Sequence, residues 1–302
     1  MATTTALPPP SSRGDRWAGP GMLLPFALFY LVFLVGPLVY AVIAGFFETS
    51  LLKSGLGDFA GWSNYASVLG DSEFWRTLRN TLRFTVLTTV PLVLLSLVLA
   101  LLADRFMRGR WFFRFAFFAP FVLPSAVVSL LFMFIYADQV GLAQSVATSL
   151  GVDSPPSWLG DPDWAMVSIT VATVWWTIGF NFVLYLAGLQ EVPREVHEAA
   201  AVDGAGPWQR IRLVVVPMLG RTTTLVTVLQ VIASLKVFDQ IYMMTGGGPD
   251  GSTRPSLQLI YDTGFVEGRV GYASTVSLLL FMVILFVSLV WFALVRRAEK
   301  EN

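Results

Sequence analysis

The residues that could do chemistry are concentrated in a charged stretch, Glu191–Leu219, between two long apolar runs of this 302-residue chain. The sequence has a single histidine, His197, and no cysteine, which excludes a histidine metal cluster and a thiolate metal site. It also has no glycine-rich loop that ends in Gly-Lys-Ser/Thr, so it lacks the loop with which ATPases hold phosphates. We therefore expect no catalytic residue, no metal ligand and no bound cofactor, and we interpret the charged stretch as a recognition surface.

The charged stretch predicts two short helices joined by a turn. Pro193 suits a first helical position, and Gly204 can take the left-handed conformation that ends a helix. Pro207 begins the second helix, which Pro217 is expected to interrupt. One apolar face of the second helix is formed by Trp208, Ile211 and Val215. A solvated loop is the alternative, but two bounded helices with alanines on one face favour a docking surface.

Polar side chains inside the apolar runs form a second group of candidates. Such groups are costly in a membrane and usually face a cavity or a partner. Aromatic faces stack on sugar rings and amides bind hydroxyls, so the candidates for a solute path are Trp175, Trp176, Asn181, Tyr185, Gln230, Ser234 and Asp239. Two alternatives stay open. Most membrane tryptophans serve as belt or packing residues. Lys236 and Asp239, one helical turn apart, could form a structural ion pair.

The elements that must position these residues are membrane spans. The chain is 55% hydrophobic and 13% charged, whereas an ordinary soluble domain has about 25% charged residues. Six apolar runs approach the roughly 20 residues that cross a bilayer: Met22–Phe47, Leu82–Ala103, Phe115–Tyr136, Trp164–Leu189, Thr222–Met244 and Tyr272–Leu294. Polar residues break the fifth run. We expect an all-α membrane protein with a disordered tail at 1–20, a membrane domain at 21–295 and a second tail at 296–302.

The distribution of positive charge predicts the orientation. Six spans put both termini on one side of the membrane, and Lys and Arg in short loops favour the cytoplasm. The two tails, the loop 104–114 and the charged stretch with Arg221 hold thirteen of the twenty Lys and Arg residues. A formal net charge of zero gives no reason to expect nucleic-acid binding. Both termini and Glu191–Leu219 are therefore expected in the cytoplasm.

The charged stretch also resembles a known family. Its pattern of Glu-Ala-Ala, three residues, Gly, nine residues and a final apolar-x-apolar-Pro is similar to the EAA loop of ABC-importer membrane subunits. The residues that carry this resemblance are Glu198, Ala199, Ala200, Asp203, Gly204, Ala205 and Pro217. Val214 and Val216 stand where the family usually has Ile and Leu.

A second resemblance points to the carbohydrate-uptake branch of that family, which includes maltose-type, trehalose-type and glycerol-phosphate-type permeases. It rests on Trp62-Ser63-Asn64-Tyr65, Asn80-Thr81, Phe238-Asp239-Gln240-Ile241-Tyr242 and Thr245-Gly246-Gly247. Together the two resemblances cover roughly Phe59 to Leu294. Lys236 is the one intramembrane cation that would suit a phosphate, so a neutral sugar is favoured, although the sequence does not identify the solute.

These resemblances imply a type I ABC-importer permease in the cytoplasmic (inner) membrane. The chain would form half of a translocation path, and the EAA loop would couple it to an ATPase. The implied partners are a second permease chain in a heterodimer, two ATP-binding subunits that hold ATP and Mg, an extracytoplasmic solute-binding protein and membrane lipid. The alternative is an independent secondary transporter or channel, suggested by the broken fifth run. No paired inverted repeat supports it.

Overall fold

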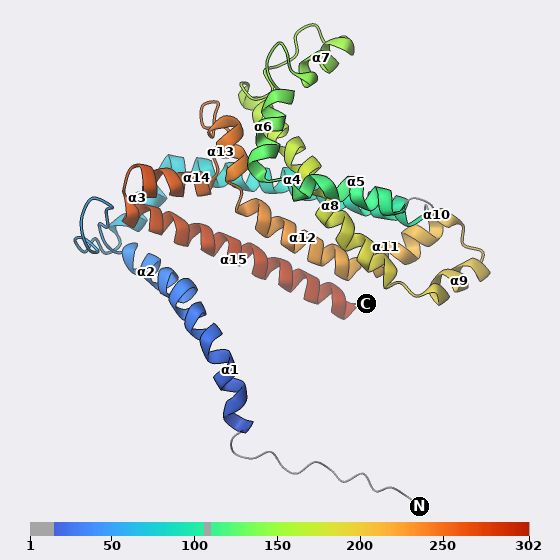
Figure 1. Cartoon of the computed structure of the whole chain (residues 1–302), viewed down its shortest axis with the longest axis horizontal. Helices are drawn as coiled ribbons and strands as arrows, with labels where there is room; N and C mark the ends of the chain where they lie inside the picture. The colour runs from blue at the N-terminus through green and yellow to red at the C-terminus, as the bar shows by residue number, and fades with distance from the viewer. Residues whose placement is uncertain (1–14, 106–109, 302) are drawn as a thin grey trace, which may run out of the picture.

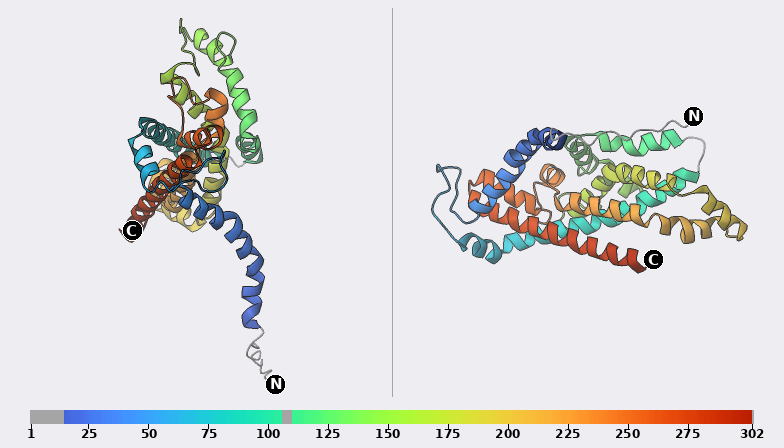
Figure 2. Two further views of the ribbon diagram at one scale, coloured as in Figure 1. Left: turned by 90° about the vertical axis from the view of Figure 1, so that its left-hand side faces the viewer. Right: turned by 90° about the horizontal axis from the view of Figure 1, so that it is seen from below.

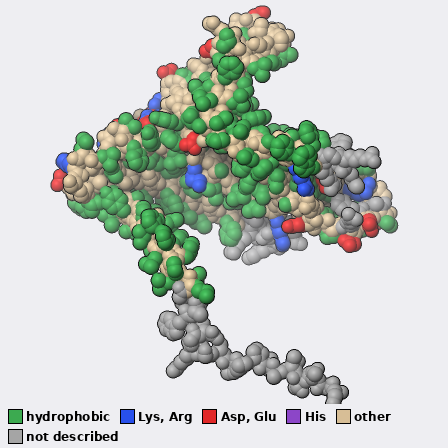
Figure 3. Space-filling model, viewed as in Figure 1, with side chains coloured by type: hydrophobic (Ala, Val, Ile, Leu, Met, Phe, Trp, Pro, Cys, Tyr) green, Lys and Arg blue, Asp and Glu red, His purple; other side chains and the backbone are tan. Residues whose placement is uncertain are grey.

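The computed structural model describes residues 15–105 and 110–301. In these residues the chain is helical throughout, apart from loops and one isolated bridge between Phe47 and Phe59 (Figure 1). The all-α membrane fold predicted from the sequence is confirmed. Most of the visible surface of the bundle is hydrophobic, as expected for a face in contact with lipid (Figure 3).

Four continuous helical stretches are long and apolar enough to cross a membrane: Met22–Ala44, Ser72–Asp104, Pro162–Gln190 and Val270–Ala293. They belong to α1 (Asp15–Tyr30) with the π-helical η1 (Leu31–Val35) and α2 (Gly36–Ala44), to α4 (Ser72–Arg105), to α8 (Pro162–Gln190) and to α15 (Val270–Glu301). The predicted second and fourth spans lie within these stretches, whereas the predicted first span runs three residues beyond Ala44 and the predicted sixth runs one residue beyond Ala293. Helix α15 continues through residues 296–301, and residues 1–14 of the predicted first tail lie outside the described residues.

The predicted third span is bent. Helix α5 (Arg110–Val122) and α6 (Ser125–Ile135) meet at 96°. Pro124 explains the break, since proline has no N–H to donate and disfavours a helical conformation at the residue before it, Leu123. A single straight span over Phe115–Tyr136 is therefore not what the chain forms.

The fifth span is broken as predicted. Helix α12 (Gly220–Leu235) ends before three connecting residues, 236–238, and α13 (Asp239–Thr245) follows. The helix before α12 was expected to be interrupted at Pro217, but the break lies two residues later, at Leu219. That helix runs through α10 (Pro207–Arg210), the π-helical η2 (Ile211–Val215) and α11 (Val216–Met218), and then meets α12 at 62°. The wider π turn, in which the Val216 N–H binds the Ile211 carbonyl, lets the chain pass Pro217 without ending the helix.

The shorter helices lie between the spans. They are α3 (Ser63–Gly70), α7 (Leu142–Ser149), α9 (Arg194–Val202) and α14 (Ser256–Tyr261), which leads into the π-helical η3 (Asp262–Val266). Helix α3 lies in the loop between the first two predicted spans. That loop is shorter than predicted, because α4 already begins at Ser72, where the Asp71 carboxylate accepts the Glu73 N–H at 2.8 Å.

Helix α4 is the centre of the bundle and packs against α8 and α12, while α5 packs along α8. The α5–α8 contact is close because Gly179 has no side chain. A Cβ atom there would lie 2.0 Å from the Phe117 carbonyl oxygen. Two ends of the bundle can be named from Figures 1 and 2. The α10 end carries α9–α11 and the last turns of α15, and the α14 end carries α3 and α14.

Helix α1 stands apart from the bundle (Figure 1). Its described side chains are exposed from Met22 to Tyr30, and the stretch is held to the rest of the chain through the packing of α2 on α15. An exposed apolar helix of this length must lie against lipid or another protein when the chain is in a membrane.

Candidate functional site

A polar cavity of about 180 Å³ lies within the bundle, where α4, α6, α8, α12 and α13 converge. Of the predicted path residues, it is lined by Trp176, Gln230, Ser234 and Asp239. Polar side chains that were not predicted also line it: Ser125, Thr173, Thr177 and Gln240, together with Lys236. Because polar groups are costly inside a membrane, this concentration marks the cavity as the candidate site.

Two side-chain hydrogen bonds cross between helices beside this cavity. Asn181, which is fully buried, donates from Nδ2 to Gln230 Oε1 at 3.2 Å and so joins α8 to α12. One face of α8 also carries Thr173, whose Oγ1 donates to Gln240 Oε1 at 2.8 Å and so joins α8 to α13. Thr173, Thr177 and Asn181 are spaced by four residues, which places them on one side of the helix.

Each of these bonds leaves one half of an amide unused. Gln240 Nε2 and Asn181 Oδ1 are both buried and have no hydrogen-bond partner. An unpaired buried polar atom costs about 1–3 kcal/mol, so such atoms call for an explanation. One is a spare donor and the other a spare acceptor, and a hydroxyl group can satisfy either kind. The region around these two hydrogen bonds is therefore suited to a solute rich in hydroxyl groups.

Lys236 and Asp239 line the cavity without pairing with each other. Both are exposed, and no ion pair joins them in the described structure, so the predicted structural pair does not form. Instead, Lys236 caps the C-terminus of α12 and Asp239 is the first residue of α13. Each charge has the sign that its helix end favours. The cavity thus presents one positive and one negative group.

Three of the predicted path residues do not line the cavity: Trp175, Tyr185 and Asn181, which lies beside it on α8. Trp175 is 41% exposed and packs edge-on against Phe132, with ring centroids 5.4 Å apart. Tyr185 is buried in an apolar cluster with Phe182 and Leu219. By contrast, Trp176 lines the cavity, and its Nε1 donates to the Leu123 carbonyl at 3.1 Å.

The cavity-lining residues that were not predicted differ in whether the sequence contained a signal for them. The four-residue spacing of Thr173, Thr177 and Asn181 was a signal, because it aligns polar groups on one helix face within an apolar run. Gln240 carried no such signal. Its approach to Thr173 depends on the direction that α13 takes after the break in the fifth span.

The charged stretch forms the two helices that were predicted, at the α10 end. Helix α9 ends at Val202, and the turn after it contains Gly204, which has φ +78°; the Ala205 N–H binds the Ala200 carbonyl at 3.0 Å. Glu198, Ala199 and Asp203 are exposed, like Gly204. No atom lies within 4 Å of where a Cβ at Gly204 would be. The face that carries the Glu-Ala-Ala residues is therefore open to a partner.

The second helix of this pair is only partly anchored. Val215 and Leu219 are buried against the bundle, whereas Trp208, expected to share that apolar face, is 71% exposed. A pocket of about 280 Å³ separates α10 and η2 from the ends of α4 and α8, and Arg210 and Asp104 are among the residues that line it. The helix pair is fixed at its α12 side and open on the other.

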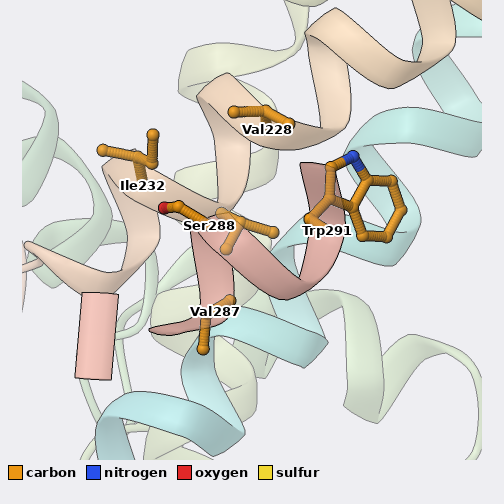
Figure 4. Close-up of a pocket in the computed structure, with 6 residues that line it drawn as sticks. Val228, Ile232, Val287, Ser288 and Trp291 are labelled. Carbon is orange, nitrogen blue, oxygen red and sulfur yellow. The ribbon is translucent and has the colours of Figure 1, made fainter. Parts of the chain in front are cut away.

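A further pocket, of about 20 Å³, lies between α12 and α15 (Figure 4). Val228 and Ile232 face Val287, Ser288 and Trp291 across it. Its lining is almost wholly apolar and carries no charged residue, so it does not compete with the polar cavity as a solute site. Among the described residues, no group of three His, Asp or Glu side chains is arranged to hold a metal ion.

Comparison with known proteins gives close agreement in sequence and in fold. The chain is 32% identical over 286 residues to the sulfoquinovosyl glycerol transport system permease protein SmoG of Agrobacterium fabrum, covering 95% of this chain and 92% of that one. It is 33% identical over 274 residues to the trehalose/maltose transport system permease protein MalF of Thermococcus litoralis, covering 89% and 90%. A crystal structure of a bacterial ABC transporter that imports the acidic polysaccharide alginate shares the fold, with a TM-score of 0.81 and 23% identity over 94% of this chain and 96% of that one.

The family described as "binding-protein-dependent transport system inner membrane component" matches residues 93–300. The match runs from within α4 to the last turn of α15 and so includes the exposed helix pair and all the residues that line the polar cavity except Phe84. It leaves no support for an independent secondary transporter or channel. The chain belongs to this family of multi-pass inner membrane proteins, the permease subunits of ABC importers.

Proposed function

We propose that this chain forms half of the path along which an ATP-driven importer carries a sugar or a related polyol. The observation that carries the proposal is the polar cavity: Gln240 in its lining and Asn181 beside it each keep one buried amide atom without a partner. A membrane bundle gains no stability from such atoms. A passing hydroxyl group would satisfy them for the time that it spends in the cavity.

The charges of the cavity favour a solute without net charge. Lys236 and Asp239 offer one charge of each sign, and both are suited to the helix ends on which they lie. Similar permeases are named for trehalose and maltose and for multiple sugars, and also for the acidic solutes sulfoquinovosyl glycerol and sn-glycerol-3-phosphate. All of these solutes carry hydroxyl groups, which amides can bind, and the preference for a neutral sugar rests on the charges of the cavity.

Coupling to the ATPase is assigned to the exposed helix pair. Glu198 would make a charged contact, while Ala199, Ala200 and Ala205 would allow close approach. Asp203 and Gly204 form the turn, and Pro217 lies where the pair meets the bundle. Exposure of the α9 face supports this assignment, because an ATPase seated there would meet no obstruction from the chain itself. Movement of α10 would pass directly to α12 through the 62° bend.

The remaining partners follow from this arrangement. A second, similar permease chain would complete the path, and two ATP-binding subunits carrying ATP and Mg would sit at the α10 end. The solute-binding protein would dock at the α14 end. The excess of Lys and Arg in the tails, the 104–114 loop and the helix pair supports a cytoplasmic α10 end with both termini on that side.

Sugar uptake by the reconstituted importer tests the proposal. The complex with its binding protein and ATPase is placed in vesicles, and uptake of trehalose, maltose and glycerol phosphate is compared. Gln240→Leu removes the spare donor and is expected to raise KM for the transported sugar about tenfold, which corresponds to about 1.4 kcal/mol. Gln144→Leu, on α7 outside the cavity, is the matched control and should leave KM unchanged. Equal KM values for the two variants would contradict a path through the cavity.

A further inference from the structure

The loop that follows α13, residues 246–255, is fastened to the first turns of α4. Arg76 Nη1 donates to the Asp250 carbonyl at 3.0 Å. Asn80 Nδ2 donates to the carbonyls of Gly251 at 2.9 Å and Arg254 at 3.1 Å. These bonds join segments more than 170 residues apart in the sequence, so they fix the loop to a distant helix and not merely to its own neighbours.

Arg254 is the charged centre of this attachment. Its Nη1 lies 3.0 Å from Glu73 Oε1 on α4, and its Nη2 lies 2.5 Å from Asp262 Oδ2 at the end of α14. The three side chains are 23%, 22% and 23% exposed, so water screens their attraction less than it screens a surface pair. Glu73 also pairs with Arg76. One guanidinium thus ties together α4, the loop and α14.

The loop is also tied within itself and to α14. Thr253 Oγ1 donates to the Gly248 carbonyl at 2.7 Å, and Gln258 Nε2 donates to the Gly246 carbonyl at 2.8 Å. Gly247 has φ +86°, and a Cβ there would lie 2.8 Å from Gln258 Oε1. The loop and α14 are therefore expected to move as one unit with the first turns of α4.

Helix α13 connects the loop 246–255 to the cavity. The loop follows α13 directly, and the first residues of α13, Asp239 and Gln240, line the cavity. Toward α12, by contrast, only residues 236–238 connect the two helices. Resting on the function proposed above, we propose that Arg254 is a positioning residue: by holding the loop on α4, it keeps α13 in place as the cavity wall nearest the α14 end. Gln240 is then held within reach of Thr173.

Thiol labelling tests this role without requiring transport. The native chain has no cysteine, so Ser234→Cys, at a cavity-lining residue that is only 3% exposed, places a single reporter on the cavity lining. The intact complex in vesicles is treated with a membrane-impermeant maleimide from the side of the α14 end. Arg254→Gln is expected to raise the labelling rate of the reporter about tenfold, and Arg254→Lys, which keeps the charge, should raise it less. Arg269→Gln removes an arginine at the same end that pairs with Glu267 at 3.5 Å outside the loop, and should leave the rate unchanged.

A second reporter separates loss of positioning from loss of folding. Ala172→Cys lies on α8 and is fully buried, so it should stay unreactive in both arginine variants. Equal reporter labelling with Arg254 and with Arg254→Gln would overturn the proposal, as would labelling of Ala172→Cys in Arg254→Gln. Failure of the proposed function would appear differently, as an unaltered chain that neither transports sugar nor retains an ATPase, whatever the labelling rates.

Discussion

The hydrogen bond between Asn181 and Gln230 allows the structural and transport roles of the cavity to be separated. Asn181→Leu removes the donor and leaves Gln230 Oε1, on a residue only 8% exposed, without its partner. An orphaned buried acceptor costs about 1–3 kcal/mol. The variant should therefore be less stable than the unaltered chain by about that amount, and transport should weaken as well.

Adding Gln230→Met to Asn181→Leu removes the orphaned acceptor. Replacing both partners by apolar groups of similar size is nearly neutral, so the double variant should recover most of the lost stability. It should not recover transport, because the amide of Gln230 in the cavity lining and the amide of Asn181 beside it are both lost to a passing hydroxyl group. The assays are thermal unfolding of the purified complex and sugar uptake into vesicles, each measured for both single variants and the double. Normal uptake by the double variant would refute the assignment of Asn181 and Gln230 to the solute path.

Two further predictions follow from the packing of α5 and from the two adjacent tryptophans. Gly179→Ala places a Cβ 2.0 Å from the Phe117 carbonyl oxygen, so α5 and α8 must separate; we expect a loss of about 1–3 kcal/mol in thermal unfolding, and an unchanged melting temperature would contradict the close contact. Trp176→Phe removes the Nε1 donor to Leu123 and one cavity wall, whereas Trp175→Phe changes a ring outside the cavity. Sugar uptake measured across solute concentrations should show a raised KM for Trp176→Phe alone. Equal KM values for the two variants would argue against a place for Trp176, and not Trp175, in the cavity wall.

The broad fold was predictable because lipid imposes a simple rule. A span must be a long apolar helix, and positive charge marks its cytoplasmic loops, so run length and composition located the spans. Local breaks were harder. Lys236 and Asp239 indicated the break in the fifth span. The helix continues past Pro217 through a π turn, and Pro124 explains a break before α6 but does not determine its 96° angle. The direction of a helix after a break depends on what it packs against, which the sequence does not state.

Part of the candidate site was also predictable, namely the polar and aromatic residues within apolar runs, whereas the contacts set by tertiary packing were not. Gln230, Ser234 and Trp176 were identified because polar and aromatic groups stand out within an apolar run. Trp175 has the same character as Trp176 but faces away, since adjacent helical residues point about 100° apart. Gln240 reaches Thr173 through the tertiary position of α13, so no spacing rule reveals it.

We propose above that an ATPase couples to this permease through the exposed helix pair at the α10 end. Co-purification of the ATPase with the tagged chain tests it most directly. Glu198→Arg reverses a charge on the open face of α9, and Gly204→Pro cannot adopt the φ of +78° at the turn. Asp58→Arg is the matched control, an equal charge reversal on an exposed residue of the α2–α3 loop. We expect the unaltered chain and Asp58→Arg to retain the ATPase and both other variants to lose it; equal retention by all four chains would rule out coupling through this helix pair.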